Sequence, residues 1–346
     1  MHSIAQDHGG ASFAALQTLG PGACDFSSNV NPWGCSPRVR QALSTVPISH
    51  YPDRDCRELR GALAAHEGVP GDTIICGNGS SELIRALCYW LEPGTVVSFP
   101  EPTFGEYRAA AATARLQIAA HDFRSHPGLQ CVIDEFIRFV RAHGPGLVFL
   151  CSPNNPTGQG LPPADLERLA DACEPGILVV DQAYREYTPE VGGPLSPRIL
   201  RLCSLTKAYG LAGLRLGYLV GPASILSGIG RYLPPWSVSA AAQTAGVAAL
   251  RDQRWLQETV DRRADAAAVL RQLLSASGFE IRTEGAGFLT LRVGRAAAWR
   301  DQLLTDGLVV RDCTSFGLPD TLRLSPGPVD ACRRLVEAMV KIREGM

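Results

Sequence analysis

Residues 204–221 read Ser-Leu-Thr-Lys-Ala-Tyr-Gly-Leu-Ala-Gly-Leu-Arg-Leu-Gly-Tyr-Leu-Val-Gly, and this stretch decides the fold class. It places Lys207 and Arg215 in a glycine-rich turn between two apolar runs. Of the 33 basic residues only Lys207 and Lys341 are lysines. An arginine cannot lose its proton to act as an amine nucleophile, whereas a desolvated lysine can. A GC-rich genome would explain why the chain has so few lysines. It would not explain why one of the two lies beside the hydroxyls of Ser204 and Thr206. Lys207 is therefore the candidate nucleophile.

The composition is that of a globular enzyme with a sizeable core. The chain has 346 residues, of which 45% are apolar and 19% charged, and its net charge is −1. This length allows one large α/β domain and a smaller one, and we find no charge block that predicts binding to nucleic acid or membranes. Eleven scattered cysteines without a CxxC pair, and no signal peptide, predict a cytoplasmic protein with reduced thiols. We expect no metal site.

Short apolar segments alternate with helical patterns through the first two thirds of the chain. This alternation predicts a mostly parallel sheet covered by helices on both faces. A long helical region and then a differently ordered α+β segment follow. We therefore divide the chain into an N-terminal arm (1–33), a large α/β domain (34–238), an interdomain helix (239–276) and a small C-terminal domain (277–346). The expected strands of the large domain are 73–76, 96–99, 116–120, 147–151, 177–181, 199–203 and 214–220.

Polar motifs follow several of these strands, where parallel sheets bind their ligands. The turn Gly77-Asn78-Gly79-Ser80-Ser81 leads into a helix and predicts an anion site, although an ordinary turn would look the same. Asp181 ends a strand three residues before Tyr184, and a helix cap is the alternative reading of this carboxylate. Asn155 lies in the constrained turn 152–158, which also follows a strand.

Together these groups suit pyridoxal 5′-phosphate, an aromatic aldehyde with a phosphate, a phenolic oxygen and a ring nitrogen. Lys207 would carry the cofactor as an imine, and Asp181 would keep the ring nitrogen protonated so that the ring withdraws electrons. Asn155 and Tyr184 would bind the phenolic oxygen, and Phe104 would stack on the ring or simply pack. The expected phosphate ligands are Gly79, Ser80, Ser204, Thr206 and Arg215.

Three motifs resemble a known family, namely Asn-Asn-Pro-Thr-Gly (154–158), Asp-x-Ala-Tyr (181–184) and the stretch 204–218. They resemble the aspartate aminotransferase fold type (fold type I) of pyridoxal-phosphate enzymes, and within it the histidinol-phosphate aminotransferase branch. The resemblance implies an α/β fold with a mostly parallel, seven-stranded type of sheet and a smaller C-terminal domain. It also implies a homodimer with shared active sites, in which Tyr51 reaches the cofactor phosphate of the partner subunit.

A narrower resemblance concerns the L-threonine-O-3-phosphate decarboxylases of cobalamin biosynthesis. It rests on His-Gly-Gly (8–10), Asp-Phe-Ser-Ser-Asn-Val-Asn-Pro (25–32) and Pro-Trp-Ser-Val (235–238). It implies a carbon–carbon lyase acting on O-phospho-L-threonine or a close phospho-amino acid. The implied substrate-binding residues are His8, Gly9, Asn29, Asn155, Arg311 and Arg323, the last of which matches the carboxylate-binding arginine of the wider fold type.

The sequence departs from the decarboxylase pattern at two positions. Tyr184 stands where a decarboxylase can have phenylalanine and an aminotransferase has tyrosine, and Gly327 replaces a frequent second basic residue. Either reaction suits the scaffold, because the substrate Cα bond held perpendicular to the cofactor plane is the one that breaks. We predict decarboxylation, with histidinol-phosphate transamination as the alternative. A regulator of the same fold would carry a DNA-binding domain, for which the arm is too short.

Overall fold

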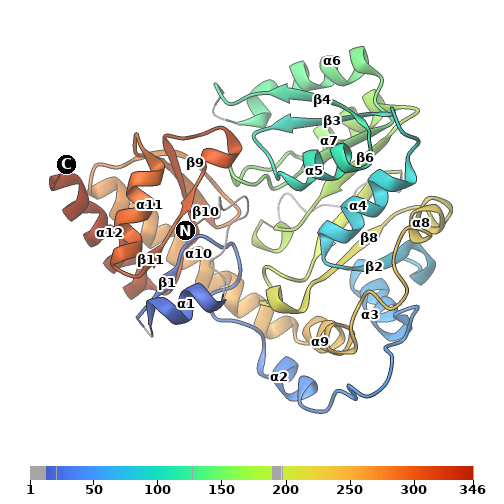
Figure 1. Cartoon of the computed structure of the whole chain (residues 1–346), viewed down its shortest axis with the longest axis horizontal. Coiled ribbons are helices and arrows are strands. Elements are labelled where there is room, and N and C mark those ends of the chain that lie inside the picture. Colours follow the sequence, from blue (N-terminus) through green and yellow to red (C-terminus); the bar gives the residue numbers. More distant parts are fainter. Residues whose placement is uncertain (1–12, 21, 127, 189–195, 197, 346) are drawn as a thin grey trace.

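The computed structural model describes residues 13–20, 22–126, 128–188, 196 and 198–345. A large α/β domain is joined to a smaller domain by the long helix α10 (Gln253–Ala276), which runs along the base of both (Figure 1). His8 and Gly9, predicted to bind substrate, lie outside the described residues. Two short helices, α1 (Phe13–Leu19) and α2 (Pro37–Leu43), precede the first strand of the large domain's sheet.

The large domain is built on a seven-stranded sheet with the order β2-β8-β7-β6-β5-β3-β4. Only β8 runs antiparallel to its neighbours, and every other pair is parallel. The mostly parallel sheet predicted from the alternation of apolar segments is thus confirmed. The strand bounds in chain order are β2 (Ile74–Asn78), β3 (Val96–Glu101), β4 (Gln117–Asp122), β5 (Leu147–Cys151), β6 (Ile177–Asp181), β7 (Leu200–Ser204) and β8 (Leu216–Val220).

Helices cover both faces of this sheet because alternate side chains of each strand point to opposite sides. In β5, Leu147 and Phe149 pack into one apolar cluster, and Val148 and Leu150 pack into another. One face is covered by α4 (Ser80–Trp90), α5 (Glu106–Thr113) and α8 (Ala223–Gly230). The other is covered by α3 (Arg57–Glu67), α6 (Ile133–His143), α7 (Pro163–Cys173) and α9 (Ala240–Leu250).

The smaller domain contains an antiparallel sheet of order β12-β13-β10-β9 and a two-stranded parallel sheet, β1-β11. The pairing of β1 with β11, together with the buried Phe26, makes the described end of the predicted arm part of this domain's core. The element bounds are β1 (Cys24–Asp25), β9 (Glu280–Gly285), β10 (Phe288–Arg292), α11 (Ala296–Thr305), β11 (Leu308–Val309), β12 (Arg311–Asp312), β13 (Thr321–Leu324) and α12 (Val329–Glu344).

The single interdomain helix expected over 239–276 is in fact two helices, α9 and α10. The helix is interrupted at Arg251 and Asp252. There the Asp252 carboxylate accepts a hydrogen bond from the Trp255 N–H at 3.4 Å. This is an N-terminal cap, which begins a new helix rather than extending the preceding one. The predicted helical content is correct, but its continuity is not.

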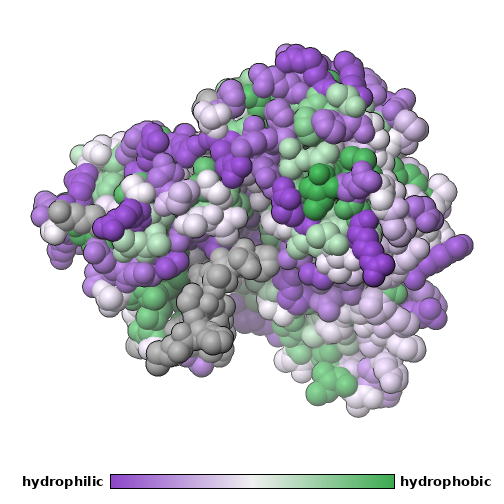
Figure 2. Space-filling model, turned by 45° about the horizontal axis from the view of Figure 1, so that its top comes forward, coloured by the Kyte–Doolittle hydropathy of each residue, from purple (hydrophilic) through white to green (hydrophobic). Residues whose placement is uncertain are grey.

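Hydrophilic residues predominate on the face shown in Figure 2, and the hydrophobic ones lie singly or in small groups. Within the described ranges, we find no helix with the length and apolar character needed to cross a membrane.

A buried ion-pair network fastens α3 to the central sheet. The Glu67 side chain is only 3% exposed and accepts hydrogen bonds of 2.5 Å from Arg185, Arg201 and Tyr218. Burial alone would raise the pKa of Glu67, but the hydrogen bonds and charges of Arg185 and Arg201 outweigh it and lower that pKa to about 2. Glu67 is therefore ionised and fully paired at neutral pH.

We predict that Glu67→Gln lowers the free energy of unfolding by about 3–5 kcal/mol at pH 7, because it leaves Arg201 without its carboxylate and Arg185 with only that of Glu186. The control Glu58→Gln removes an exposed carboxylate of the same helix and should cost under about 0.5 kcal/mol. Urea denaturation measures both. Since the folded-state pKa is lowered, the wild-type advantage is full above the ordinary pKa of 4.5 and is lost as the pH falls toward 2. Equal losses in the two variants would contradict this account.

Candidate active site

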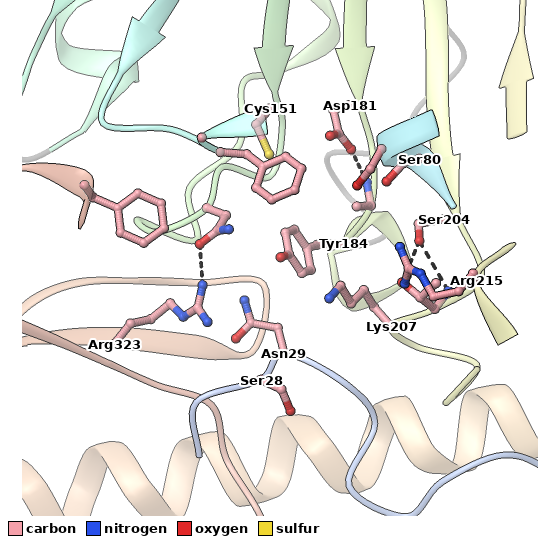
Figure 3. Close-up of a pocket in the computed structure, with 17 residues that line it drawn as sticks. Ser28, Asn29, Ser80, Cys151, Asp181, Tyr184, Ser204, Lys207, Arg215 and Arg323 are labelled. Carbon is pink, nitrogen blue, oxygen red and sulfur yellow. Dashed lines mark hydrogen bonds between the residues drawn. The ribbon is translucent and has the colours of Figure 1, made fainter. Parts of the chain in front are cut away.

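A cavity of about 240 Å³ lies beyond the carboxyl ends of the parallel strands. Figure 3 shows side chains from both domains pointing into it. Since β8 is antiparallel, its first residues lie at this same edge of the sheet. The lining residues are Ser28, Asn29, Ser80, Ser81, Phe104, Gly105, Cys151, Asn155, Asp181, Ala183, Tyr184, Ser204, Thr206, Lys207, Arg215, Phe316 and Arg323.

Lys207 follows β7 and points into this cavity (Figure 3). Burial, together with the positive charges of Arg323 and Arg215, lowers the pKa of Lys207 to about 8. A larger share of this amine is therefore neutral and nucleophilic near neutral pH than in an exposed lysine. The backbone around it is held by Asn31, which donates to the carbonyls of Lys207 at 3.0 Å and Ala208 at 2.9 Å.

Asp181 ends β6 and is 2% exposed. One carboxylate oxygen accepts from the Ala183 N–H at 3.0 Å, and the other accepts from the Tyr107 hydroxyl at 2.7 Å. The Tyr107 ring is itself stacked on Phe149, with 4.8 Å between ring centroids. Burial raises the pKa of Asp181 to about 6, although the two hydrogen bonds act to lower it. The carboxylate is thus fixed in a dry site, where a cationic group would stabilise its charge.

The start of α4 forms an anion cradle beside Lys207. Gly79 has φ +79°, and a Cβ there would lie 2.5 Å from Arg215 Nη2, so glycine lets the guanidinium approach the helix N-terminus. The hydroxyls of Ser204 and Thr206 hydrogen-bond each other at 2.7 Å in the same wall. Ser80 begins the helix and lines the cavity (Figure 3). A helix N-terminus with an arginine and several hydroxyls suits a phosphate group.

Arg323 supplies a second positive charge on the opposite side of the cavity (Figure 3). Its side chain is buried and donates to two neutral oxygens, the Asn155 amide oxygen and the Ser27 carbonyl, the latter at 2.5 Å. Its Nε has no hydrogen-bond partner within the described chain. A buried guanidinium paired only with neutral groups is a strong site for an anion such as a carboxylate. The predicted contact of Asn155 with a phenolic oxygen would then come from its amide nitrogen.

Tyr184 and Asn29 complete the polar wall. Tyr184 is 6% exposed, and burial raises the pKa of its hydroxyl to about 12, so that the phenol remains protonated and can donate. Asn29 is 1% exposed, and neither polar atom of its amide has a hydrogen-bond partner among the described residues. Such an amide at a cavity wall is available to a bound ligand.

Three predicted residues of the described chain, Gly79, Tyr51 and Arg311, do not line the cavity. Gly79 comes directly before Ser80, at the start of α4. Tyr51 is 82% exposed and lies against Trp236, with 4.9 Å between ring centroids. Arg311 is buried, donates to Ser315 Oγ at 2.6 Å and lies 5.3 Å from the centre of the Phe316 ring, which does line the cavity. Arg311 therefore lies behind Phe316, outside the layer of side chains that lines the cavity.

Sequence reasoning missed several residues of the site. Cys151 ends β5 as Asp181 ends β6, and this strand-end position was the available signal. Tyr107 lies on the buried face of α5, where a tyrosine is not distinguishable from ordinary core packing. Asn31 lies in the motif 25–32, but that motif does not indicate a contact with Lys207, and Phe316 carried no signal. In the ranges described, no cluster of three or more His, Cys, Asp or Glu residues could hold a metal ion.

Comparison with known proteins identifies the family. The aminotransferase class I and II family matches residues 21–339, and the chain belongs to this family. Histidinol-phosphate aminotransferase of Paracoccus denitrificans is 36% identical over 330 residues, covering 91% of this chain and 88% of that protein.

Two solved structures show the same fold. Histidinol-phosphate aminotransferase from Sinorhizobium meliloti, in complex with pyridoxal-5′-phosphate, has a TM-score of 0.86 at 22% identity, covering 97% of this chain and 95% of that one. L-threonine-O-3-phosphate decarboxylase from Porphyromonas gingivalis has a TM-score of 0.78 at 23% identity, covering 92% and 99%. The predicted fold type I architecture is confirmed.

The cofactor of this family is pyridoxal 5′-phosphate, and the site fits it. The hydrogen bonds to Asp181 do not offset the cost of burying its negative charge, and a protonated ring nitrogen would stabilise that charge. The cradle at Gly79 and Arg215 suits the phosphate, and Lys207 offers an amine with a lowered pKa. The predicted cofactor is therefore confirmed by the family, and each of its charged parts has a matching group in the cavity.

We predict that Asp181→Asn keeps the fold but lowers kcat by about 10²-fold or more, the scale of losing a positioned charge in a dry site. The amide is nearly the same size, and its oxygen can still accept from the Tyr107 hydroxyl or from the Ala183 N–H, so the charge is lost together with one hydrogen bond. The control Asp171→Asn removes an exposed carboxylate of α7 and should leave kcat unchanged. Steady-state turnover measures both, and normal turnover of Asp181→Asn would show that the carboxylate is only a turn cap.

Proposed function

We propose that the chain is a pyridoxal-phosphate-dependent aminotransferase of the histidinol-phosphate type. The observation that carries this proposal is the full-length similarity to histidinol-phosphate aminotransferases, two of which are 36% identical to this chain. The tyrosine at position 184, at the cavity wall, agrees with it. Decarboxylation, which the segments 8–10, 25–32 and 235–238 predicted, has less support from the relatives.

The charged groups of the cavity divide the work of transamination among them. Bound pyridoxal phosphate supplies an electron sink for the negative charge that develops at the substrate Cα. Lys207, with its lowered pKa, would take the Cα proton as a neutral amine and would then deliver it, from the ammonium form, to the cofactor carbon that receives the amino group. Arg323 holds the substrate carboxylate or phosphate, since its Nε is unpaired and its charge is not neutralised by its present partners. Asp181 keeps its negative charge beside the ring nitrogen.

Decarboxylation of O-phospho-L-threonine remains the second candidate because of one observation. The amide of Asn29, from the segment that carries that resemblance, lies buried at the cavity wall without a partner. In that reaction Arg323 would hold the substrate carboxylate perpendicular to the cofactor plane. His8, Gly9 and Asn29 would then contact the substrate phosphate, and Arg311, which does not line the cavity, would add its positive charge from behind Phe316.

Two parallel incubations separate these functions. The holoenzyme is given L-histidinol phosphate with 2-oxoglutarate in one, and O-phospho-L-threonine in the other. Glutamate and carbon dioxide are measured in both. We expect glutamate in the first incubation and no carbon dioxide in the second. Carbon dioxide from phosphothreonine without glutamate from histidinol phosphate would replace our proposal by the second candidate, and neither product would overturn both.

We also propose that the chain works as a homodimer with shared active sites. Tyr51 and Trp236 form an exposed aromatic pair, and Ile48 nearby in the sequence is 90% exposed. Large apolar side chains gathered on a surface are typical of regions that another protein covers. In such a dimer Tyr51 would reach the cofactor phosphate of the partner subunit, which explains its absence from the cavity of its own chain.

Mixing two inactive variants tests the shared site. Lys207→Ala lacks the amine, and Tyr51→Phe lacks the hydroxyl that the partner requires. After subunit exchange at equal amounts, about a quarter of the wild-type activity should return, since half of the dimers are mixed and each has one intact site. Tyr89→Phe, at another exposed tyrosine, should be active by itself. No recovery despite proven exchange would indicate sites built within one chain.

A further inference from the structure

A second cavity, of about 360 Å³, lies against α10 and the strands β9 and β10 of the small domain. These three elements are labelled in Figure 1. It contains none of the groups that we assign to catalysis. Most of its wall is apolar, and its lining includes Val260, Ala264, Ala267, Leu270, Leu289 and Pro326.

The wall of this cavity also contains Arg263, a buried arginine of α10 that is 1% exposed. Its Nη2 donates to Ser325 Oγ at 2.8 Å, and its guanidinium carbon lies 4.3 Å from the centre of the Tyr187 ring. Nε and Nη1 have no hydrogen-bond partner in the described part of the chain. Arg263 is thus a buried cation held in place by neutral groups.

This arrangement is costly without a ligand. An ionised group removed from water needs an opposite charge or a full set of hydrogen bonds, and Arg263 has neither. Burial lowers the pKa of Arg263, yet an arginine keeps its proton in proteins. Gly287, with φ +67°, brings its backbone against this side chain, since a Cβ there would lie 2.8 Å from Nε. Nη1 is the other donor without a partner among the described residues, on a side chain that lines the cavity.

The charge balance around the cavity restricts the ligand. Arg271 and Glu284 also line it, and they form an exposed ion pair with 3.6 Å between N and O, so their charges offset each other. The remaining charge is the single positive one of Arg263. One cation in an otherwise apolar cavity suits one negative charge on an apolar body, whereas a phosphate ester would require more donors than these residues provide.

We propose that this cavity binds a small amphipathic monocarboxylate, with its carboxylate on Arg263 and its apolar part against α10 and β10. Phe288 lines this cavity, and its ring lies 5.3 Å from the Tyr184 ring and 5.6 Å from the Arg323 guanidinium, measured between group centres. The ligand therefore binds behind the substrate side of the active site, separated from it by one aromatic ring. The assignment is independent of which reaction the active site performs.

Isothermal titration of the cofactor-loaded protein with octanoate tests the proposal. We expect saturable binding of one octanoate per chain, and much weaker binding of octanol and inorganic phosphate. Arg263→Leu should weaken octanoate binding by about tenfold or more, because a hydrogen bond to a charged group is lost. The matched control Arg262→Leu removes the same charge from an exposed position one residue away and should bind as the wild type does.

A second variant keeps the proposal testable if Arg263→Leu does not fold. Ala267→Phe fills the cavity from α10 and leaves the guanidinium in place, so it should abolish octanoate binding while thermal unfolding remains cooperative. Unchanged binding in Ala267→Phe or in folded Arg263→Leu would place octanoate elsewhere, for example on Arg323, and overturn the proposal. Absence of saturable binding to the wild type would also overturn it.

Discussion

The site depends on one constraint, which is that charged side chains are buried away from water. They lie at the edge of the central sheet where the parallel strands end. Burial shifts the pKa of Lys207 down to about 8 and that of Asp181 up to about 6, so both are moved toward their neutral forms. Arg323 is buried with only neutral oxygens as hydrogen-bond partners in the described chain. A cofactor with a phosphate and a protonatable ring nitrogen supplies two of the missing opposite charges, and under the proposed function a substrate phosphate or carboxylate would supply the third.

Much of the fold and of the cofactor site could be predicted from the sequence, because parallel strands end at one edge of a sheet. Asp181 and Ser204 end neighbouring strands, and Arg215 directly precedes the antiparallel strand β8, which starts at the same edge. Local sequence therefore determines where these side chains meet. The reaction type is different, because it depends on which substrate bond is oriented toward the cofactor face. The arm motifs favoured decarboxylation, whereas the relatives favour transamination.

What the sequence could not show arises from contacts between distant segments. Tyr107 supports Asp181 from α5, and Asn31 holds the backbone of Lys207, although nothing near either residue indicates its partner. The pairing of β1 with β11, which attaches the N-terminal segment to the small domain, is equally invisible in a local pattern. The cap at Asp252 divides a helical run whose apolar pattern continues across it. Arg263 carries no local sequence signal of burial, and only the fold buries it.

The most direct test of the central claim is to locate the cofactor on the chain. The holoenzyme is reduced with borohydride, digested, and its peptides are mapped by mass spectrometry. The buried amine with the lowered pKa should carry the reduced pyridoxyl group, so the label should lie on the peptide that contains Lys207 and be absent from the Lys207→Ala protein. A label on Lys341, or an unchanged label in Lys207→Ala, would contradict the account.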